Sequence, residues 1–137
     1  MVWEVSCIIF YALVLSSSAS TVILSPSGNN ATFCLGQTGH FTCEVSGPVL
    51  FWEYTGYAGV GFSTGALTTR LLGPDIEVEL LSVCSAPEPF VRSMATVTVT
   101  SSINGTQLLC RSSVYRIGTP SKEVDFYVLS KLLKYTL

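Results

Sequence analysis

Short runs in which apolar and polar residues alternate make up most of the chain after residue 20. A period of two places successive side chains on opposite faces of an extended backbone, so each run is predicted to be a β-strand with one buried face. Gly, Pro, Ser and Asn separate the runs, as is typical of turns. The predicted strands cover residues 21–24, 40–45, 49–54, 76–83, 94–100, 107–115 and 123–129.

Strands of this number and spacing predict an all-β fold, an antiparallel sandwich of two sheets whose inner faces supply the core. A closed barrel is the alternative architecture. The sandwich is expected to occupy residues 21–130 as one domain, and residues 131–137 are expected to form a frayed C-terminal tail.

A glycine-rich stretch at residues 55–65 interrupts the alternation. Its Gly59-Val60-Gly61 sequence has Thr64 where a phosphate-binding loop would need a third glycine, and no helix is predicted after it. The stretch is therefore interpreted as a flexible loop without a phosphate site.

The N-terminus carries an 11-residue apolar run at residues 5–15, followed by small residues at 16–20. This pattern is typical of a secretory signal peptide, assigned to residues 1–20. The run is shorter than the roughly 20 residues that span a bilayer, so an uncleaved anchor is the weaker alternative and no membrane span is predicted. Cleavage removes Cys7 and leaves four cysteines in an oxidising compartment, where Asn30 and Asn104 begin glycosylation sequons.

Composition excludes several classes of function. The 137-residue chain has a net charge of -2, too little positive charge for nucleic-acid capture, and its 48% hydrophobic content argues against disorder. The single histidine, His40, falls on the polar face of a strand, with no cluster of acidic or nucleophilic residues arranged around it. The cysteines lack the C-x-x-C spacing of zinc sites. We therefore expect no catalytic residue, metal or cofactor.

Three residues carry a resemblance to a known family: Cys43 on the second predicted strand, Trp52 on the third, and Cys110 on the penultimate strand. The chain resembles the immunoglobulin superfamily in this pattern, and the distance of 58 residues from Trp52 to Cys110 leaves room for the extra strands of a variable-type domain. The resemblance implies a Greek-key sandwich in which a Cys43–Cys110 disulfide joins the sheets and Trp52 packs against it. Leu108 stands where many members have the tyrosine of the tyrosine corner, so an Asn104-Gly105-Thr106 turn is expected there instead.

With the core bridge assigned in this way, Cys34 and Cys84 remain, and we expect them to form a second disulfide. The alternative is that both are free or intermolecular thiols.

The two sheets are predicted to differ in their outward residues. One sheet presents polar side chains, namely His40, Thr42, Glu44, Thr96, Thr98 and Thr100. The other presents Phe51, Glu53, Leu109, Arg111, Asp125 and Tyr127. An apolar patch with charges around it is typical of an interface, so Phe51, Glu53, Leu109, Arg111 and Tyr127 are predicted to contact a protein partner. The alternative is that the glycine-rich stretch or the tail covers them.

The sequence thus favours a secreted or cell-surface, non-enzymatic recognition or adhesion module. Its partner is expected to be a cell-surface or extracellular protein, with self-association as one option, and residues 116–121 are expected to form its most variable tip. Three alternatives stay open: a soluble fragment of an immunoglobulin-superfamily membrane receptor, a structural module of the extracellular matrix, and an enzyme or enzyme inhibitor on a β-sandwich.

Overall fold

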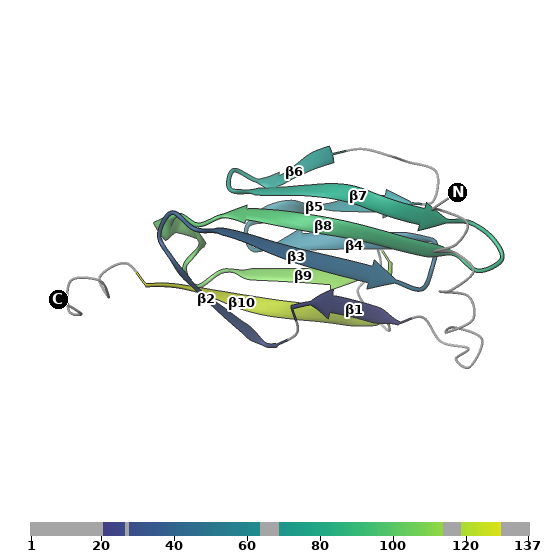
Figure 1. Cartoon of the computed structure of the whole chain (residues 1–137), viewed down its shortest axis with the longest axis horizontal. Helices are drawn as coiled ribbons and strands as arrows, with labels where there is room; N and C mark the ends of the chain where they lie inside the picture. The colour runs from purple at the N-terminus through teal and green to yellow at the C-terminus, as the bar shows by residue number, and fades with distance from the viewer. Residues whose placement is uncertain (1–20, 27, 64–68, 114–118, 130–137) are drawn as a thin grey trace.

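A computed structural model of the chain describes residues 21–26, 28–63, 69–113 and 119–129. Figure 1 shows two layers of extended strands packed face to face. The described elements are β1 (Val22–Ser25), β2 (Asn30–Cys34), β3 (Thr38–Val45), β4 (Val49–Tyr54), β5 (Tyr57–Ser63), β6 (Thr69–Gly73), β7 (Ile76–Cys84), β8 (Phe90–Thr98), the short 3₁₀ helix η1 (Ser101–Ile103), β9 (Gln107–Arg111) and β10 (Ser121–Leu129).

Each layer is a five-stranded sheet. One has the order β1-β3-β8-β7-β6 and the other the order β2-β10-β9-β4-β5. All strand pairs are antiparallel except β2 with β10, which run parallel. The all-β, two-sheet sandwich predicted from the alternating pattern is confirmed. The signal peptide and the tail were assigned to residues 1–20 and 131–137, which lie outside the described residues.

Two additional strands lie between Trp52 and Cys110, as the length of that segment predicted, but they join different sheets. β5 pairs with β4 and extends the sheet that contains Trp52. β6 pairs with β7 at the edge of the opposite sheet. The expectation of a flexible loop at residues 55–65 is wrong for Tyr57–Ser63, which form a regular strand.

The centre of the core is a disulfide with a tryptophan beside it. Cys43 of β3 and Cys110 of β9 are bonded across the two sheets with their Cα atoms 6.6 Å apart. Trp52 is fully buried and lies directly opposite Cys110 in the β4–β9 ladder. Its indole Nε1 donates a hydrogen bond to Ser93 Oγ at 2.9 Å, and that hydroxyl donates to Glu79 O at 2.6 Å. The inter-sheet bridge and the position of Trp52 are therefore confirmed.

The predicted Cys34–Cys84 disulfide is wrong. Cys34 has a free thiol, and Cys84 is bonded to a different cysteine. Cys34 lies at the end of the sandwich where Gly36 N donates to Val99 O, whereas Cys84 is paired with Phe90 at the opposite end. The nine-residue β8 runs between these ends, a length of about 27 Å, and a disulfide needs Cα atoms within about 7 Å.

The turn before β9 uses Asn104 and Gly105 in place of a tyrosine corner. Gly105 has a φ of 78°, a left-handed conformation that suits glycine. Asn104 Oδ1 accepts a hydrogen bond from Val128 N at 2.9 Å, and Gly105 N donates to Phe126 O at 2.8 Å. The turn therefore fastens β9 to β10, and Leu108 is completely buried behind it.

Candidate functional site

The strand register decides which side chains face away from the core on the β2-β10-β9-β4-β5 sheet. Trp52 and Cys110 are paired and point inward, so the next pairs along the ladder, Phe51 with Arg111 and Glu53 with Leu109, point outward. We call the solvent side of this sheet the outer face. The structure brings these four predicted contact residues together on two neighbouring strands.

Arg111 holds the centre of the outer face together. Its Nη1 lies 2.6 Å from Glu53 Oε1, its Nε donates to Ser113 O at 2.8 Å, and its guanidinium carbon lies 4.6 Å from the centroid of the Phe51 ring. The side chain is only 5% exposed. The prediction that Arg111 is an exposed contact is therefore wrong. Its guanidinium donates hydrogen bonds within the chain and orients Phe51 and Glu53 instead.

Two glycines of β5 make room for the Phe51 ring. A Cβ atom on Gly59 would collide with the edge of the ring and would lie 2.9 Å from Trp52 O, and one on Gly61 would lie 3.1 Å from Phe51 Cδ1. The ring therefore lies flat over bare backbone and stays partly exposed. Glycines at alternate positions of one strand, opposite an aromatic residue of the neighbouring strand, are the sequence signal that could have predicted this contact. The same signal could have predicted strand β5 itself.

Tyr127 belongs to a different part of the outer face. Glu123 is the residue of β10 that lies opposite Leu109, and Tyr127 is four residues further along, about 13 Å away. There Tyr127 is 46% exposed and Leu129 is 41% exposed, and they pair with Thr32 and Cys34 of β2. The predicted contact set is thus divided into a central group and a separate apolar end.

The outer face also contains a hollow that the sequence did not reveal. Its volume is about 290 Å³, and it is lined by Glu53, Tyr54, Thr55, Gly56, Tyr57, Gln107 and Leu109. The Tyr54 and Tyr57 rings stack with their centroids 5.6 Å apart. Burial raises the pKa of Tyr54 above its ordinary value of 10.0, and a hydrogen bond with the Thr106 side chain partly opposes that rise. Glu53 is the acidic residue that lines the hollow, and it lies beside Leu109.

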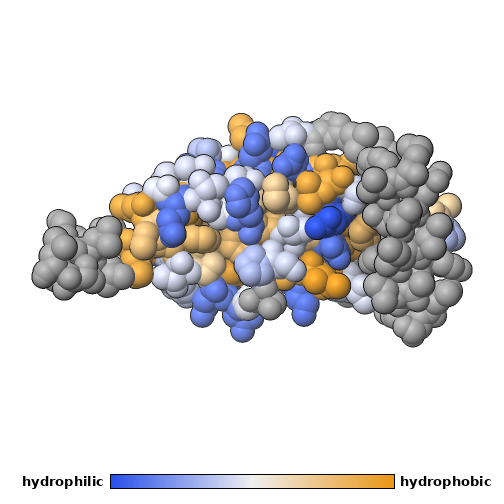
Figure 2. Space-filling view, in the orientation of Figure 1, coloured by the Kyte–Doolittle hydropathy of each residue, from blue (hydrophilic) through white to orange (hydrophobic). Residues whose placement is uncertain are grey.

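The opposite sheet has a polar outer surface along its two central strands. Arg92 Nε of β8 lies 3.1 Å from Glu44 Oε2 of β3, and Thr96 Oγ1 lies 3.4 Å from His40 Nδ1. Its exposed apolar side chains are confined to the edge strands, where Ile23 is 51% and Leu71 is 69% exposed. In Figure 2, hydrophilic residues are interspersed across the middle of the visible side, and hydrophobic residues gather towards its ends.

Other predicted sites can be placed without being tested. Asn30 at the start of β2 and Asn104 are both exposed, and glycosylation at either remains a prediction. The expected variable tip at residues 116–121 is described only from Thr119 onward. Among the described residues, no three or more His, Cys, Asp or Glu side chains gather where they could hold a metal ion. In the same part of the chain, no helix has the length and apolar character needed to cross a bilayer.

Comparison with known proteins identifies the fold. Neither protein-family models nor curated protein sequences give a match. Solved structures do match: the RIG-5 IG1 homodimer at a TM-score of 0.52 and 18% identity covers 82% of this chain and 99% of its own. Rst D1-D2 matches at a TM-score of 0.51 and 11% identity over 82% of this chain, and the chain spans only 49% of that protein. At such identities the likeness shows the fold, which is immunoglobulin-like.

Proposed function

We propose that this chain is an extracellular recognition module, secreted or displayed at a cell surface, that binds a protein partner through the centre of its outer face. The observation that carries the proposal is the group formed by Phe51, Glu53 and Leu109 around the buried Arg111. Aromatic and apolar side chains held in fixed positions, with charge close by, are the features that concentrate binding energy in protein interfaces.

Rigidity supports the same proposal. Phe51 is confined between the Arg111 guanidinium and the glycines of β5, so it has little side-chain entropy left to lose on binding. The ion pair has one well-buried partner, and it holds the Glu53 carboxylate at the rim with 22% of its side chain exposed. A partner would therefore meet a preorganised apolar surface with a fixed negative charge.

The chemistry of the cysteines and the fold support the proposed extracellular location. A disulfide in the centre of the core is expected to form outside the reducing cytosol. The RIG-5 IG1 domain, which shares the fold, is described as a homodimer, so self-association is the first arrangement to test here. We assign the chain no catalytic role.

The test is a pair of charge substitutions on the outer face, Phe51→Asp combined with Leu109→Glu. Self-association is measured by sedimentation velocity, and capture of the purified glycosylated protein is measured on a panel of cell surfaces. Loss of two interface anchors is expected to weaken binding by about a hundredfold. The folded state is checked by thermal unfolding and by circular dichroism.

The matched control places the same charges on the other sheet, as His40→Asp combined with Thr96→Glu. This variant is expected to bind as the wild type does, because these positions lie on the polar central strands β3 and β8. Equal binding by the outer-face variant and the wild type would remove the proposal.

A further inference from the structure

Strand β10 has an open edge along its first half. It pairs with β9 through Ser121–Asp125, but β2 covers its other side only from Asp125 to Leu129. Asp125 N donates to Asn29 O at 2.8 Å, and before that residue the chain turns away through Gly28 toward β1. Within the described part of the chain, residues 121–124 therefore have a neighbouring strand on one side only.

The phase of the β9–β10 ladder shows which backbone groups face the open side. Ser112 N donates to Pro120 O at 3.2 Å and Phe126 N donates to Thr106 O at 2.9 Å, so the even-numbered residues of β10 bond to β9. Ser121 and Glu123 direct their N–H and C=O groups the other way, and no described strand pairs with them there. These groups are the template for one more strand.

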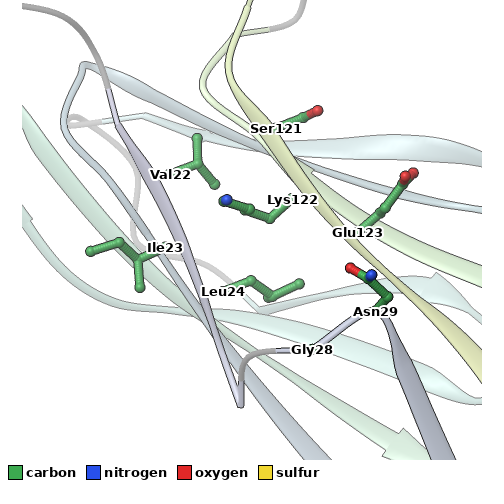
Figure 3. A pocket seen from close by; sticks show the side chains of 8 residues that line it. All are labelled: Val22, Ile23, Leu24, Gly28, Asn29, Ser121, Lys122 and Glu123. Carbon is green, nitrogen blue, oxygen red and sulfur yellow. The ribbon is translucent and has the colours of Figure 1, made fainter.

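A hollow of about 540 Å³ lies beside this edge, between β10 and β1. Val22 and Leu24 of β1 line one wall, and Figure 3 shows Lys122 reaching across the gap toward Val22 while Ser121 and Glu123 point away. Lys122 points to this side because it is the register partner of the inward-facing Cys110. Its ammonium group makes no ion pair within the described part of the chain.

We propose that this open edge binds an extended peptide segment of another protein, which adds to β10 as a strand and places a carboxylate against Lys122. Backbone hydrogen bonds to Ser121 and Glu123 supply the strand pairing, and the lysine selects an acidic side chain. Val22 and Leu24 favour an apolar neighbour for that acid on the same side of the peptide. Edge-to-edge pairing of two copies is disfavoured, because it would bring two Lys122 side chains together.

This site is separate from the outer face, since Lys122 points to the opposite side of β10 from the residues that share a face with Leu109. A Phe51→Asp, Leu109→Glu variant is therefore expected to bind the peptide normally. The two proposals can therefore fail separately. If this variant still binds the peptide, the edge site stands whether or not the outer face binds a partner.

The probe is a capped seven-residue peptide in which threonine alternates with valine, except that glutamate replaces the central valine. Titration into the ¹⁵N-labelled protein is followed by amide chemical shifts and hydrogen exchange. We expect shifts and slowed exchange centred on the Ser121 and Glu123 amides. A peptide with glutamine in place of the glutamate is expected to bind about tenfold more weakly, the worth of one charge-assisted contact.

Two substitutions at Glu123 separate backbone from side-chain effects. Glu123→Pro removes the N–H on the open side without touching a bond to β9, and it is expected to abolish peptide binding while the thermal midpoint stays close to the wild-type value. The matched control, Glu123→Ala, retains the N–H and is expected to bind normally. Lys122→Glu is expected to reverse the preference, so that a peptide with a central lysine binds better than the glutamate peptide.

Three results would overturn the proposal. The first is no amide perturbation at millimolar peptide. The second is equal affinity for the glutamate and glutamine peptides, and the third is equal binding by the Pro and Ala variants. Protection of the Ser121 and Glu123 amides that grows with protein concentration in the absence of peptide would show a second copy as the occupant and would equally contradict it.

Discussion

At the scale of single residues, the position of Phe51 is fixed by neighbours on both adjacent strands. The Arg111 guanidinium lies on one side of its ring and the backbone of Gly59 and Gly61 on the other. The alternation of β4 predicted that Phe51 points outward. It could not predict that Arg111 is covered, because burial of the guanidinium depends on the cross-strand position of Glu53 and on Ser113 O.

The two glycines under Phe51 give a matched pair of substitutions. Gly59→Ala is expected to lower the free energy of unfolding by about 1–3 kcal/mol, because its methyl group would collide with the ring and with Trp52 O. Gly61→Ala is expected to cost less, since its methyl group lies at the limit of contact with Phe51 Cδ1. Urea denaturation shows which variant loses more free energy of unfolding. Equal losses would contradict this account of how the two glycines accommodate the Phe51 ring.

Tyr54 connects the hollow on the outer face to the pH dependence of stability. Burial raises the pKa of its phenol in the folded state, so the protonated form is favoured by folding. This contribution is fully present below the unfolded-state pKa of 10.0 and is lost as the pH rises through the higher folded-state pKa. Stability is therefore expected to fall above pH 10.0, and Tyr54→Phe should make that fall shallower.

The measurement is the free energy of unfolding of the wild type and of Tyr54→Phe over a series of alkaline pH values. Tyr127→Phe serves as the control, because Tyr127 is 46% exposed and its hydroxyl makes no hydrogen bond to another of the described residues. If the free energy of unfolding falls equally steeply with pH in the wild type and in the Tyr54 variant, burial of this phenol does not cause the loss of stability at alkaline pH.

At the scale of strands, alternation of apolar and polar residues was sufficient to predict the central strands and the edge strand β1, but not the edge strands β2, β5 and β6. β3, β4 and β8 bury every second side chain, and each was predicted. β2 and β6 are short edge strands with few buried positions, so their sequences lack the period of two. β5 was missed because its glycines were interpreted as a sign of a loop, whereas they make room for the Phe51 ring of the neighbouring strand β4.

Cysteine pairing failed at this scale for a physical reason. The Cys43–Cys110 bridge joins strands that face each other in the middle of the sandwich, and the family pattern of two cysteines and a tryptophan predicted it. The position of Cys34 along the sandwich depends on β2, which was not predicted. The number of remaining cysteines was therefore insufficient to choose a partner for Cys84.

Thiol labelling checks this assignment. In the native protein, Cys34 is expected to react with iodoacetamide, whereas Cys43 and Cys110 should react only after reduction and unfolding. Replacing Cys34 by Ser should change the free energy of unfolding by less than about 0.5 kcal/mol, because it breaks no disulfide. A peptide map of the unreduced protein that links Cys34 to Cys84 would refute the pairing in the structure.

At the scale of the whole molecule, the sandwich offers a partner two different surfaces. The outer face is a preorganised patch around Phe51 and Leu109, and the open edge of β10 is a template for an added strand. The polar central strands of the other sheet carry the Arg92–Glu44 ion pair and the Thr96–His40 hydrogen bond instead. The sequence predicted this difference between the sheets, but the open edge depends on where β2 begins along β10 and could not be predicted.

The most direct test of the proposed recognition face is hydroxyl-radical footprinting of the protein alone and in its purified complex with the captured partner or its own second copy. The account predicts that oxidation of Phe51 and Leu109 falls on complex formation, while oxidation of Ile23 and Leu71 at the edges of the opposite sheet stays unchanged. Protection of Ile23 and Leu71 with unaltered oxidation of Phe51 and Leu109 would contradict it.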